Sequence, residues 1–148
     1  MKIPGPSKPL IMVGPGTGVA AFRSFIHFSR KESPERPLVL IFGCRSEYKD
    51  FYYKEEWEHL GIKVITAFSR DNEDGSKCYV QHSIRKHGAF LANLIIKDEA
   101  VIYVSGRAKN MPKSVEKAFK EILAEHSLQG NEDEALKMIQ ALRKSGRY

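Results

Sequence analysis

Short runs of consecutive apolar residues alternate along the chain with longer segments in which apolar residues recur every three or four positions. The runs are four to six residues long and rich in Val, Ile, Leu and aromatic residues. Runs of this kind are typical of strands that are covered on both faces, as in a parallel sheet. We therefore predict four buried strands, at residues 10–13, 38–42, 63–68 and 101–104.

Each predicted strand is followed by a segment in which the apolar residues have helical spacing. Asp50 and Asn131 are residue types that cap the start of a helix, and Pro112 suits a first helical turn. Gly88 is expected to divide one long helical segment into two. We predict a helix beginning at Val19 and further helices over residues 50–60, 79–97, 111–126 and from Asn131 to Ala141 or Leu142.

The resulting order of elements, β-α-β-α-β-α-β-α, predicts an α/β fold. Such alternation favours a three-layer open parallel sheet with right-handed crossovers and helices on both faces. Ligands of such sheets bind at the carboxyl ends of the strands. The segments that follow the four strands are therefore the candidate site positions: residues 14–18, 43–45, 69–70 and 105–111.

Length and composition are those of one globular domain, with 148 residues, 42% hydrophobic and 28% charged. We expect residues 1–8 to be a linker or domain edge and residues 9–148 to be the domain. No stretch approaches the roughly 18 apolar residues of a membrane span, and the first ten residues lack the apolar core of a signal peptide. Two distant cysteines and five scattered histidines indicate no metal site, and a cytoplasmic location is expected.

The first candidate segment is a glycine-rich turn, Gly14-Pro15-Gly16-Thr17-Gly18, between a predicted strand and a predicted helix. Glycine lets the backbone approach an anion, and the first N–H groups of the helix point at it. The spacing is neither G-x-G-x-x-G nor the P-loop pattern, which needs Lys-Ser/Thr after the glycines. A plain strand–helix turn is the alternative interpretation.

The next two segments carry basic and hydroxyl side chains. Arg45 follows the second strand, where an NAD site of the ordinary type has an acid. Ser69 and Arg70 follow the third strand, with Lys77 and Tyr79 just beyond a polar loop. These groups suit a phosphate monoester, and Tyr79 could stack on adenine. The alternative is a solvated loop.

The fourth segment, residues 105–112, is another glycine-containing turn that leads into a helix. Asn110 and the backbone groups of this turn could face a ribose or a pyrophosphate. A simple connector between strand and helix is the alternative interpretation.

Four stretches in order resemble one family: GPGTGVAAFRSF from Gly14, FGCRSEYKDFYY from Phe42, FSRDNEDGSKCYVQHSI from Phe68 and YVSGRAKNMPKSV from Tyr103. They look like the Rossmann-like NADP(H)-binding lobe of ferredoxin–NADP reductase-type flavoenzymes, specifically of the diflavin reductases. The resemblance covers nearly the whole chain. Within the family, DFYYKEEW and Met111-Pro112 look most like the NADPH-dependent diflavin oxidoreductases of cytosolic iron–sulfur assembly. Microsomal cytochrome reductases, methionine synthase reductases and nitric oxide synthase reductase domains are the near alternatives.

The resemblance implies a role for each matching position. Gly14, Gly16 and Gly18, with Thr17, would hold the pyrophosphate, and Arg45 would approach the nucleotide. Ser69, Arg70 and Lys77 would bind the 2′-phosphate, with Tyr79 against the adenine and Gln81 completing that segment. Asn110 and Met111 would lie near the ribose, and Ser105 near the nicotinamide.

Three positions depart from the family's pattern. Ser105 stands where Cys is frequent, Arg107 replaces an acidic or neutral residue, and Ser114 stands where an acid often occurs. The serine leaves the hydride-transfer rate in doubt, and the lost acid weakens one expected ribose contact.

The family's chain continues past the pair matched by Arg147-Tyr148 to a strand with an acid and a Trp. We therefore expect a fragment of a longer reductase that binds FAD and FMN elsewhere, with no complete catalytic site of its own. NADPH would give hydride to FAD, and electrons would pass to FMN and a protein acceptor, possibly an iron–sulfur protein. Alone, the chain should bind NADP(H) without turnover.

Two rival functions stay open, and the first would use the net charge of +6. A nucleic-acid binder is one, although its cations are dispersed among acids and no recognised motif is present. A flavodoxin-like or P-loop nucleotide regulator is the other, and the missing Lys-Ser/Thr counts against it.

Overall fold

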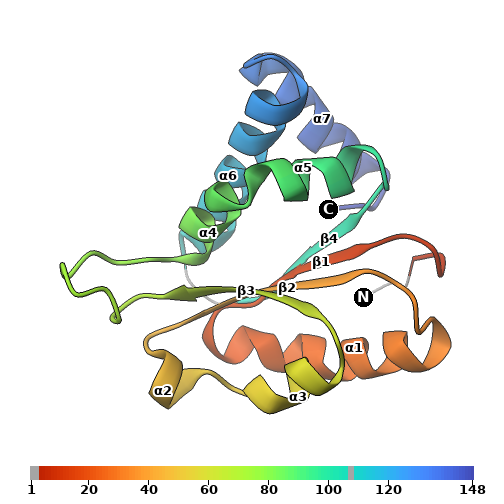
Figure 1. Ribbon diagram of the computed structural model, residues 1–148. Coiled ribbons are helices and arrows are strands. Elements are labelled where there is room, and N and C mark those ends of the chain that lie inside the picture. The colour runs from red at the N-terminus through yellow and green to blue at the C-terminus, as the bar shows by residue number, and fades with distance from the viewer. Residues whose placement is uncertain (1–3, 107–108) are drawn as a thin grey trace.

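The computed structural model describes residues 4–106 and 109–148, and its centre is a four-stranded parallel sheet (Figure 1). The strands lie in the order β3-β2-β1-β4. Their bounds are β1 Leu10–Val13, β2 Leu38–Cys44, β3 Lys63–Phe68 and β4 Val101–Val104. All four predicted strands are confirmed. β2 is two residues longer than predicted, because Gly43 and Cys44 still pair with Ala67 and Phe68 of β3.

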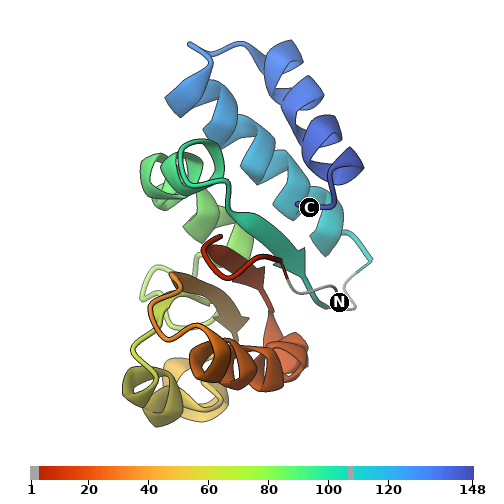
Figure 2. The same cartoon turned by 90° about the vertical axis from the view of Figure 1, so that its right-hand side faces the viewer.

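Helices cover both faces of the sheet, as Figures 1 and 2 show. One face carries α1 (Val19–Glu32), α2 (Glu47–Asp50) and α3 (Lys54–His59). The other carries α4 (Val80–Lys86), α5 (Gly88–Ile96) and α6 (Met111–Ser127), with α7 (Glu132–Lys144) packed outside α6. This arrangement confirms the predicted fold class. No helix among the described residues is long and apolar enough to cross a membrane.

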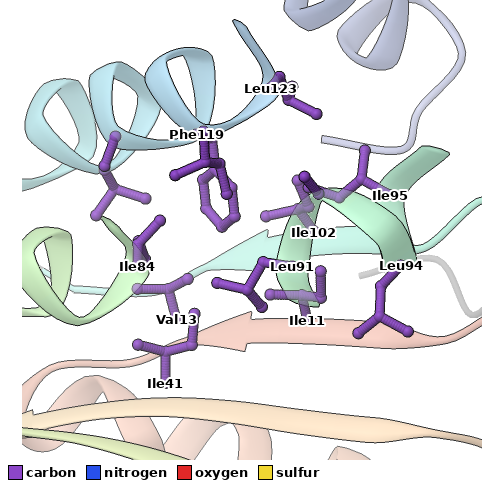
Figure 3. Packing of buried hydrophobic residues seen from close by; sticks show 14 of the residues in the cluster. Ile11, Val13, Ile41, Ile84, Leu91, Leu94, Ile95, Ile102, Phe119 and Leu123 are labelled. Atoms are coloured by element: carbon purple, nitrogen blue, oxygen red, sulfur yellow. The ribbon is translucent and has the colours of Figure 1, made fainter. Parts of the chain in front are cut away.

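Two apolar clusters, one on each face, hold the layers together. Alternate residues of β1 point to opposite faces: Leu10 and Met12 join the cluster with α1, while Ile11 and Val13 join the cluster with α4, α5 and α6. Figure 3 shows Phe119 of α6 pointing from its helix toward the β-strand side chains of the second cluster. Both faces of β1 are therefore buried, which fits its uninterrupted apolar sequence.

The helix predicted over residues 50–60 is wrong in its first half. Asp50 ends α2 instead of capping a helix, and α3 begins only at Lys54. Phe51 stacks on Phe42 of β2 with ring centroids 5.2 Å apart. This contact keeps residues 51–53, between α2 and α3, out of helical geometry. Tyr53 then takes a left-handed conformation with φ 62°, which is uncommon for a bulky residue.

The other helix predictions are close to the observed ends. His87 separates α4 from α5 next to Gly88, where a Cβ would lie 2.7 Å from His126 Nε2 of α6. Asn131 Oδ1 accepts a hydrogen bond from the Glu134 amide, as a helix cap should. α7 continues to Lys144, beyond the predicted end at Ala141 or Leu142.

The segments after β1 and β4 approach each other very closely. β1 lies between β2 and β4. The chain leaves β1 for α1 on one face of the sheet, and it leaves β4 for α6 on the opposite face. A Cβ on Gly18 would overlap the Ser105 carbonyl oxygen and lie 2.9 Å from its carbon. The Ser105 amide donates to Val13 O at 2.9 Å. Only glycine at position 18 permits this approach.

The last two residues return to the outer edge of β4. The Ile102 amide donates to Arg147 O at 2.8 Å, and the Arg147 guanidinium donates to Ile95 O at 2.6 Å. The Tyr148 ring meets Phe119 edge-on, and Arg143 lies over it. Burial raises the pKa of the Tyr148 phenol to about 12.

Substitution Gly18→Ala should lower the free energy of unfolding by about 2–3 kcal/mol, because the added methyl group overlaps rigid backbone. Urea unfolding measures the change. Gly5→Ala is the control, since nothing lies within 4 Å of a Cβ at that position. Equal stability of the two variants would contradict the close contact.

Stability should fall at alkaline pH in part through Tyr148. The unfolded phenol ionises near pH 10 and the folded one near 12, so the unfolded state loses its proton first and folding weakens between these values. We expect about 1 kcal/mol of this loss between pH 9 and 11, allowing for partial exposure. Urea titrations of the wild type and Tyr148→Phe should differ by this amount, and parallel curves would refute the assignment.

Candidate nucleotide-binding site

The four strand ends meet at one edge of the sheet, on the left of Figure 1. The segment after β1 turns through the short helix η1 (Gly16–Gly18) directly into α1. Gly16 has φ +55°, a conformation that glycine adopts without strain. The first amides of a helix have no intrahelical acceptor. The Gly16 and Thr17 amides are therefore placed as donors to an anion, while the Gly18 amide donates to Pro15 O.

The segment after β4 forms the wall next to this turn. A Cβ on Gly106 would lie 2.6 Å from Met111 Cε and 3.2 Å from Pro15 Cγ, so these three residues pack together. Ser105 is half-buried and Asn110, which precedes α6, is exposed. Met111 is 9% exposed, so its side chain belongs to the core. Arg107 lies outside the described residues.

The segments after β2 and β3 are held side by side by a continuing ladder. The Ser69 amide donates to Cys44 O and the Arg70 amide to Arg45 O, both at 2.9 Å. Asp71 Oδ2 also accepts a hydrogen bond from the Glu47 amide at 2.7 Å. The structure therefore brings Arg45, Ser69 and Arg70 together at neighbouring strand ends, as predicted from the parallel order.

Hydrogen bonds among residues 72–76 hold the middle of the loop from Ser69 to Tyr79. Asn72 Nδ2 donates to Ser76 O at 3.1 Å, and the Gly75 amide donates to Asn72 O at 3.0 Å. Asp74 Oδ1 accepts from the Ser76 amide, and hydrogen bonds from Ser76 lower the pKa of the Asp74 carboxyl. Lys77, near the end of this loop, is exposed.

Tyr79 begins α4 and is fixed by His82. The Tyr79 amide donates to His82 Nδ1 at 3.0 Å, and the two rings lie 5.9 Å apart. This pairing resembles a capping box, in which the third helical residue reaches back to the cap. The role of His82 was not predicted, although its position three residues after Tyr79 is the spacing that such a cap requires. Gln81 lies half-buried in the first turn of α4.

Several cations elsewhere in the chain are paired with acids. Arg23, Lys54, Arg85 and Arg143 form ion pairs with glutamates. Within the described part of the chain, none of three exposed site cations forms an ion pair: Arg45, Arg70 and Lys77.

Neither of the neighbouring aspartates, Asp71 or Asp74, forms an ion pair with these cations. Asp71 and Asp74 each accept a hydrogen bond from a backbone amide. Cys44, next to Arg45, is a neutral thiol at neutral pH, because burial raises its pKa to about 11. Hydrogen-bond donors therefore remain for a ligand on three exposed positive side chains and on the hydroxyl of the half-buried Ser69.

A cavity of about 530 Å³ lies elsewhere, at the amino ends of β2 and β3. Lys63 and Phe90 line it, and the Lys63 ammonium lies 4.9 Å from the Phe90 ring centre. Arg30, also in its lining, donates to backbone carbonyls, among them Leu60 O and Arg36 O. The Arg30 donors are therefore already engaged by the protein itself. The described residues hold no cluster of three metal-ligating side chains.

Comparison with known proteins gives matches over nearly the whole chain. It is 45% identical over 147 residues to NADPH-dependent diflavin oxidoreductase 1 of Danio rerio, covering 97% of this chain and 24% of the relative. It is 43% identical to NADPH–cytochrome P450 reductase of Aspergillus niger, covering 99% and 22%. It is 40% identical to NADPH-dependent diflavin oxidoreductase 1 of Arabidopsis thaliana, covering 99% and 26%. The chain thus spans about a quarter of the length of these relatives.

The family model described as oxidoreductase NAD-binding domain matches residues 12–117, from within β1 to within α6. This span contains all four strands except the first two residues of β1, and every site segment described above. The chain therefore belongs to the oxidoreductase NAD-binding domain family, in the branch whose relatives are diflavin reductases.

Proposed function

We propose that this chain binds NADPH and presents it for hydride transfer to FAD within a diflavin reductase. The observation that carries the proposal is the pair of cations Arg45 and Arg70 beside Ser69 at the ends of β2 and β3, neither in an ion pair, with the exposed Lys77 further along the loop that follows Ser69. A 2′-phosphate is the feature that distinguishes NADPH from NADH, and it carries up to two negative charges. The relatives named above are NADPH-dependent by name, which supports the same cofactor here.

The two halves of the site would bind the two kinds of phosphate. The pyrophosphate would lie on the turn from Gly14 to Gly18, against the Gly16 and Thr17 amides. The 2′-phosphate would be bound by Ser69, Arg70 and Lys77, with Arg45 beside it. The family resemblance implies these roles, and the positions of Arg45, Ser69 and Arg70 at neighbouring strand ends support them.

The remaining positions are assigned by their place along the same edge. Tyr79, at the start of α4, would lie against the adenine with Gln81 next to it. Asn110 and the backbone at Met111 would face the ribose, and Ser105 would lie near the nicotinamide. Met111 would contribute through its backbone, since its side chain is buried.

Charge-assisted hydrogen bonds account for the preference between cofactors. Each contributes roughly 1.5–3 kcal/mol. Two such bonds to the 2′-phosphate would favour NADPH by roughly 3–6 kcal/mol, or about 10²- to 10⁴-fold in affinity. NADH would leave the same cations solvated and would gain nothing from them.

The redox chemistry belongs to the cofactors, and the protein supplies binding and orientation. We propose that the whole enzyme passes electrons from FAD to FMN and then to a protein acceptor. The resemblance of the sequence motifs implies an iron–sulfur assembly protein as that acceptor, and similarity to NADPH–cytochrome P450 reductase supports a cytochrome P450 as the alternative. The chain alone would bind NADP(H) without turnover.

A nucleic-acid function is less well supported. Outside the candidate site many cations are paired with glutamates, among them Arg23, Lys54, Arg85 and Arg143. Those cations are not free to neutralise a phosphate backbone, which is the main source of affinity for nucleic acid.

Substitution Arg70→Ala should weaken binding of NADP⁺ by about tenfold or more while leaving NAD⁺ affinity within about twofold, because it removes a donor to the 2′-phosphate only. Isothermal titration calorimetry with both nucleotides measures this. Arg85→Ala is the matched control: it removes the same charge from α4, but that arginine is paired with Glu121. Equal losses for both nucleotides, or equal effects of both substitutions, would exclude Arg70 from the phosphate site.

A further inference from the structure

We propose that Ser83 is a positioning residue that holds together the two loop ends that form the 2′-phosphate site, although it does not itself face that site. The proposal rests on the proposed function, and it concerns how the loop between β3 and α4 is closed. Ser83 is a buried polar residue of α4 with 3% of its surface exposed. Its hydroxyl donates to the Thr66 carbonyl of β3 at 2.8 Å.

The pocket needs residues from both ends of one loop. Ser69 and Arg70 lie where the loop leaves β3, whereas Lys77 and Tyr79 lie where it enters α4. Figure 1 shows this loop projecting beyond the edge of the sheet. Bringing the ends of such a loop together costs conformational entropy, and a contact that closes it beforehand removes that cost from ligand binding.

The first end of the loop is fixed without Ser83. The amides of Ser69 and Arg70 continue the ladder to β2, and Asp71 accepts from the Glu47 amide. Ser69 and Arg70 therefore keep their places beside Arg45 as long as the sheet is intact.

The second end of the loop is fixed through α4. β3 is the edge strand of the sheet, so its outward carbonyls have no strand partner. Ser83 supplies a donor to one of them, that of Thr66, and so attaches the first turns of α4 to β3. Cys78 Sγ lies 3.8 Å from Ser83 Oγ. Because Cys78 stands between Lys77 and Tyr79, this contact also connects the end of the loop to Ser83.

The Ser83–Thr66 hydrogen bond is therefore the polar contact that helps to place Lys77 relative to Arg70, beside the burial of Val80 and Ile84 that anchors α4. Substitution Ser83→Ala removes this donor and leaves the Thr66 carbonyl without it, so the segment before α4 should hold Lys77 less firmly. The glycine turn and its amides lie between β1 and α1, and the substitution does not touch them. Loss of Ser83 should consequently affect the 2′-phosphate and spare the rest of the nucleotide.

The experiment compares 2′,5′-ADP with 5′-AMP, which differ only in the 2′-phosphate. Calorimetry on the 148-residue chain should show Ser83→Ala binding 2′,5′-ADP about tenfold more weakly, with 5′-AMP affinity within about twofold of wild type. Ser29→Ala is the matched control: it removes a hydroxyl that is likewise buried, but on α1 and away from this loop, and it should change both affinities by less than about twofold.

The ³¹P resonance of the bound 2′-phosphate gives a second readout that general destabilisation would not move. Free phosphate monoesters titrate near pH 6. Cations close to the group should lower that pKa in the wild-type complex, and Ser83→Ala should return it toward the free value at saturating ligand. The Ser29→Ala complex should titrate like wild type.

The outcomes separate the two proposals. Wild-type protein that binds 2′,5′-ADP and 5′-AMP equally would overturn the 2′-phosphate site and the role of Ser83 with it. Wild-type discrimination that survives Ser83→Ala, with an unchanged ³¹P titration, would overturn the role of Ser83 alone. A selective loss for 2′,5′-ADP together with a raised ³¹P pKa would support it.

Discussion

The close approach of the Gly18 and Ser105 backbones is the constraint on which the site depends. It brings the turn after β1 against the segment after β4, although 87 positions separate the two residues along the sequence. Because a side chain at position 18 would overlap a carbonyl group, the approach requires glycine. The amides of the turn thereby face the same edge as the residues near Ser105. A cofactor that spans both segments can then be bound at its middle and at one end.

The two halves of the site are built from different materials. The half at β1 and β4 consists of backbone amides and small residues, and its geometry is set by close packing. The half at β2 and β3 consists of exposed cations, whose free state depends on what the nearby acids do. Asp71 and Asp74 bind backbone amides, so they shape the loop around Arg70 and Lys77 without pairing with them. A change in the amide half can therefore alter how tightly a nucleotide binds without altering the preference for a 2′-phosphate, and a change in the cationic half can do the reverse.

Most of the fold could be predicted from the sequence, because consecutive apolar runs specify buried strands directly. The failure at residues 50–60 has a tertiary cause: Phe51 stacks on Phe42 of a strand, which no local pattern reveals. In the site, strand ends and residue types were sufficient to select Arg45, Ser69 and Arg70 as neighbours. Asp71 and Ser83 were not foreseen, because their partners are the Glu47 amide and the Thr66 carbonyl, and every residue carries such groups.

The exposure of the cationic half bears on where chemistry could take place. Arg45, Arg70 and Lys77 lie at the surface, where a phosphate would remain partly hydrated and its binding would weaken with added salt. Hydride transfer, in contrast, benefits from a site that excludes water. At the other half, Ser105 is half-buried and packs against the glycine turn, so part of a shielding wall is already present there. These exposures agree with the proposed placement, in which the reactive end of the nucleotide would lie at Ser105, where a flavin-bearing surface would complete the enclosure, and the 2′-phosphate would lie at Arg70, where open solvent does no harm.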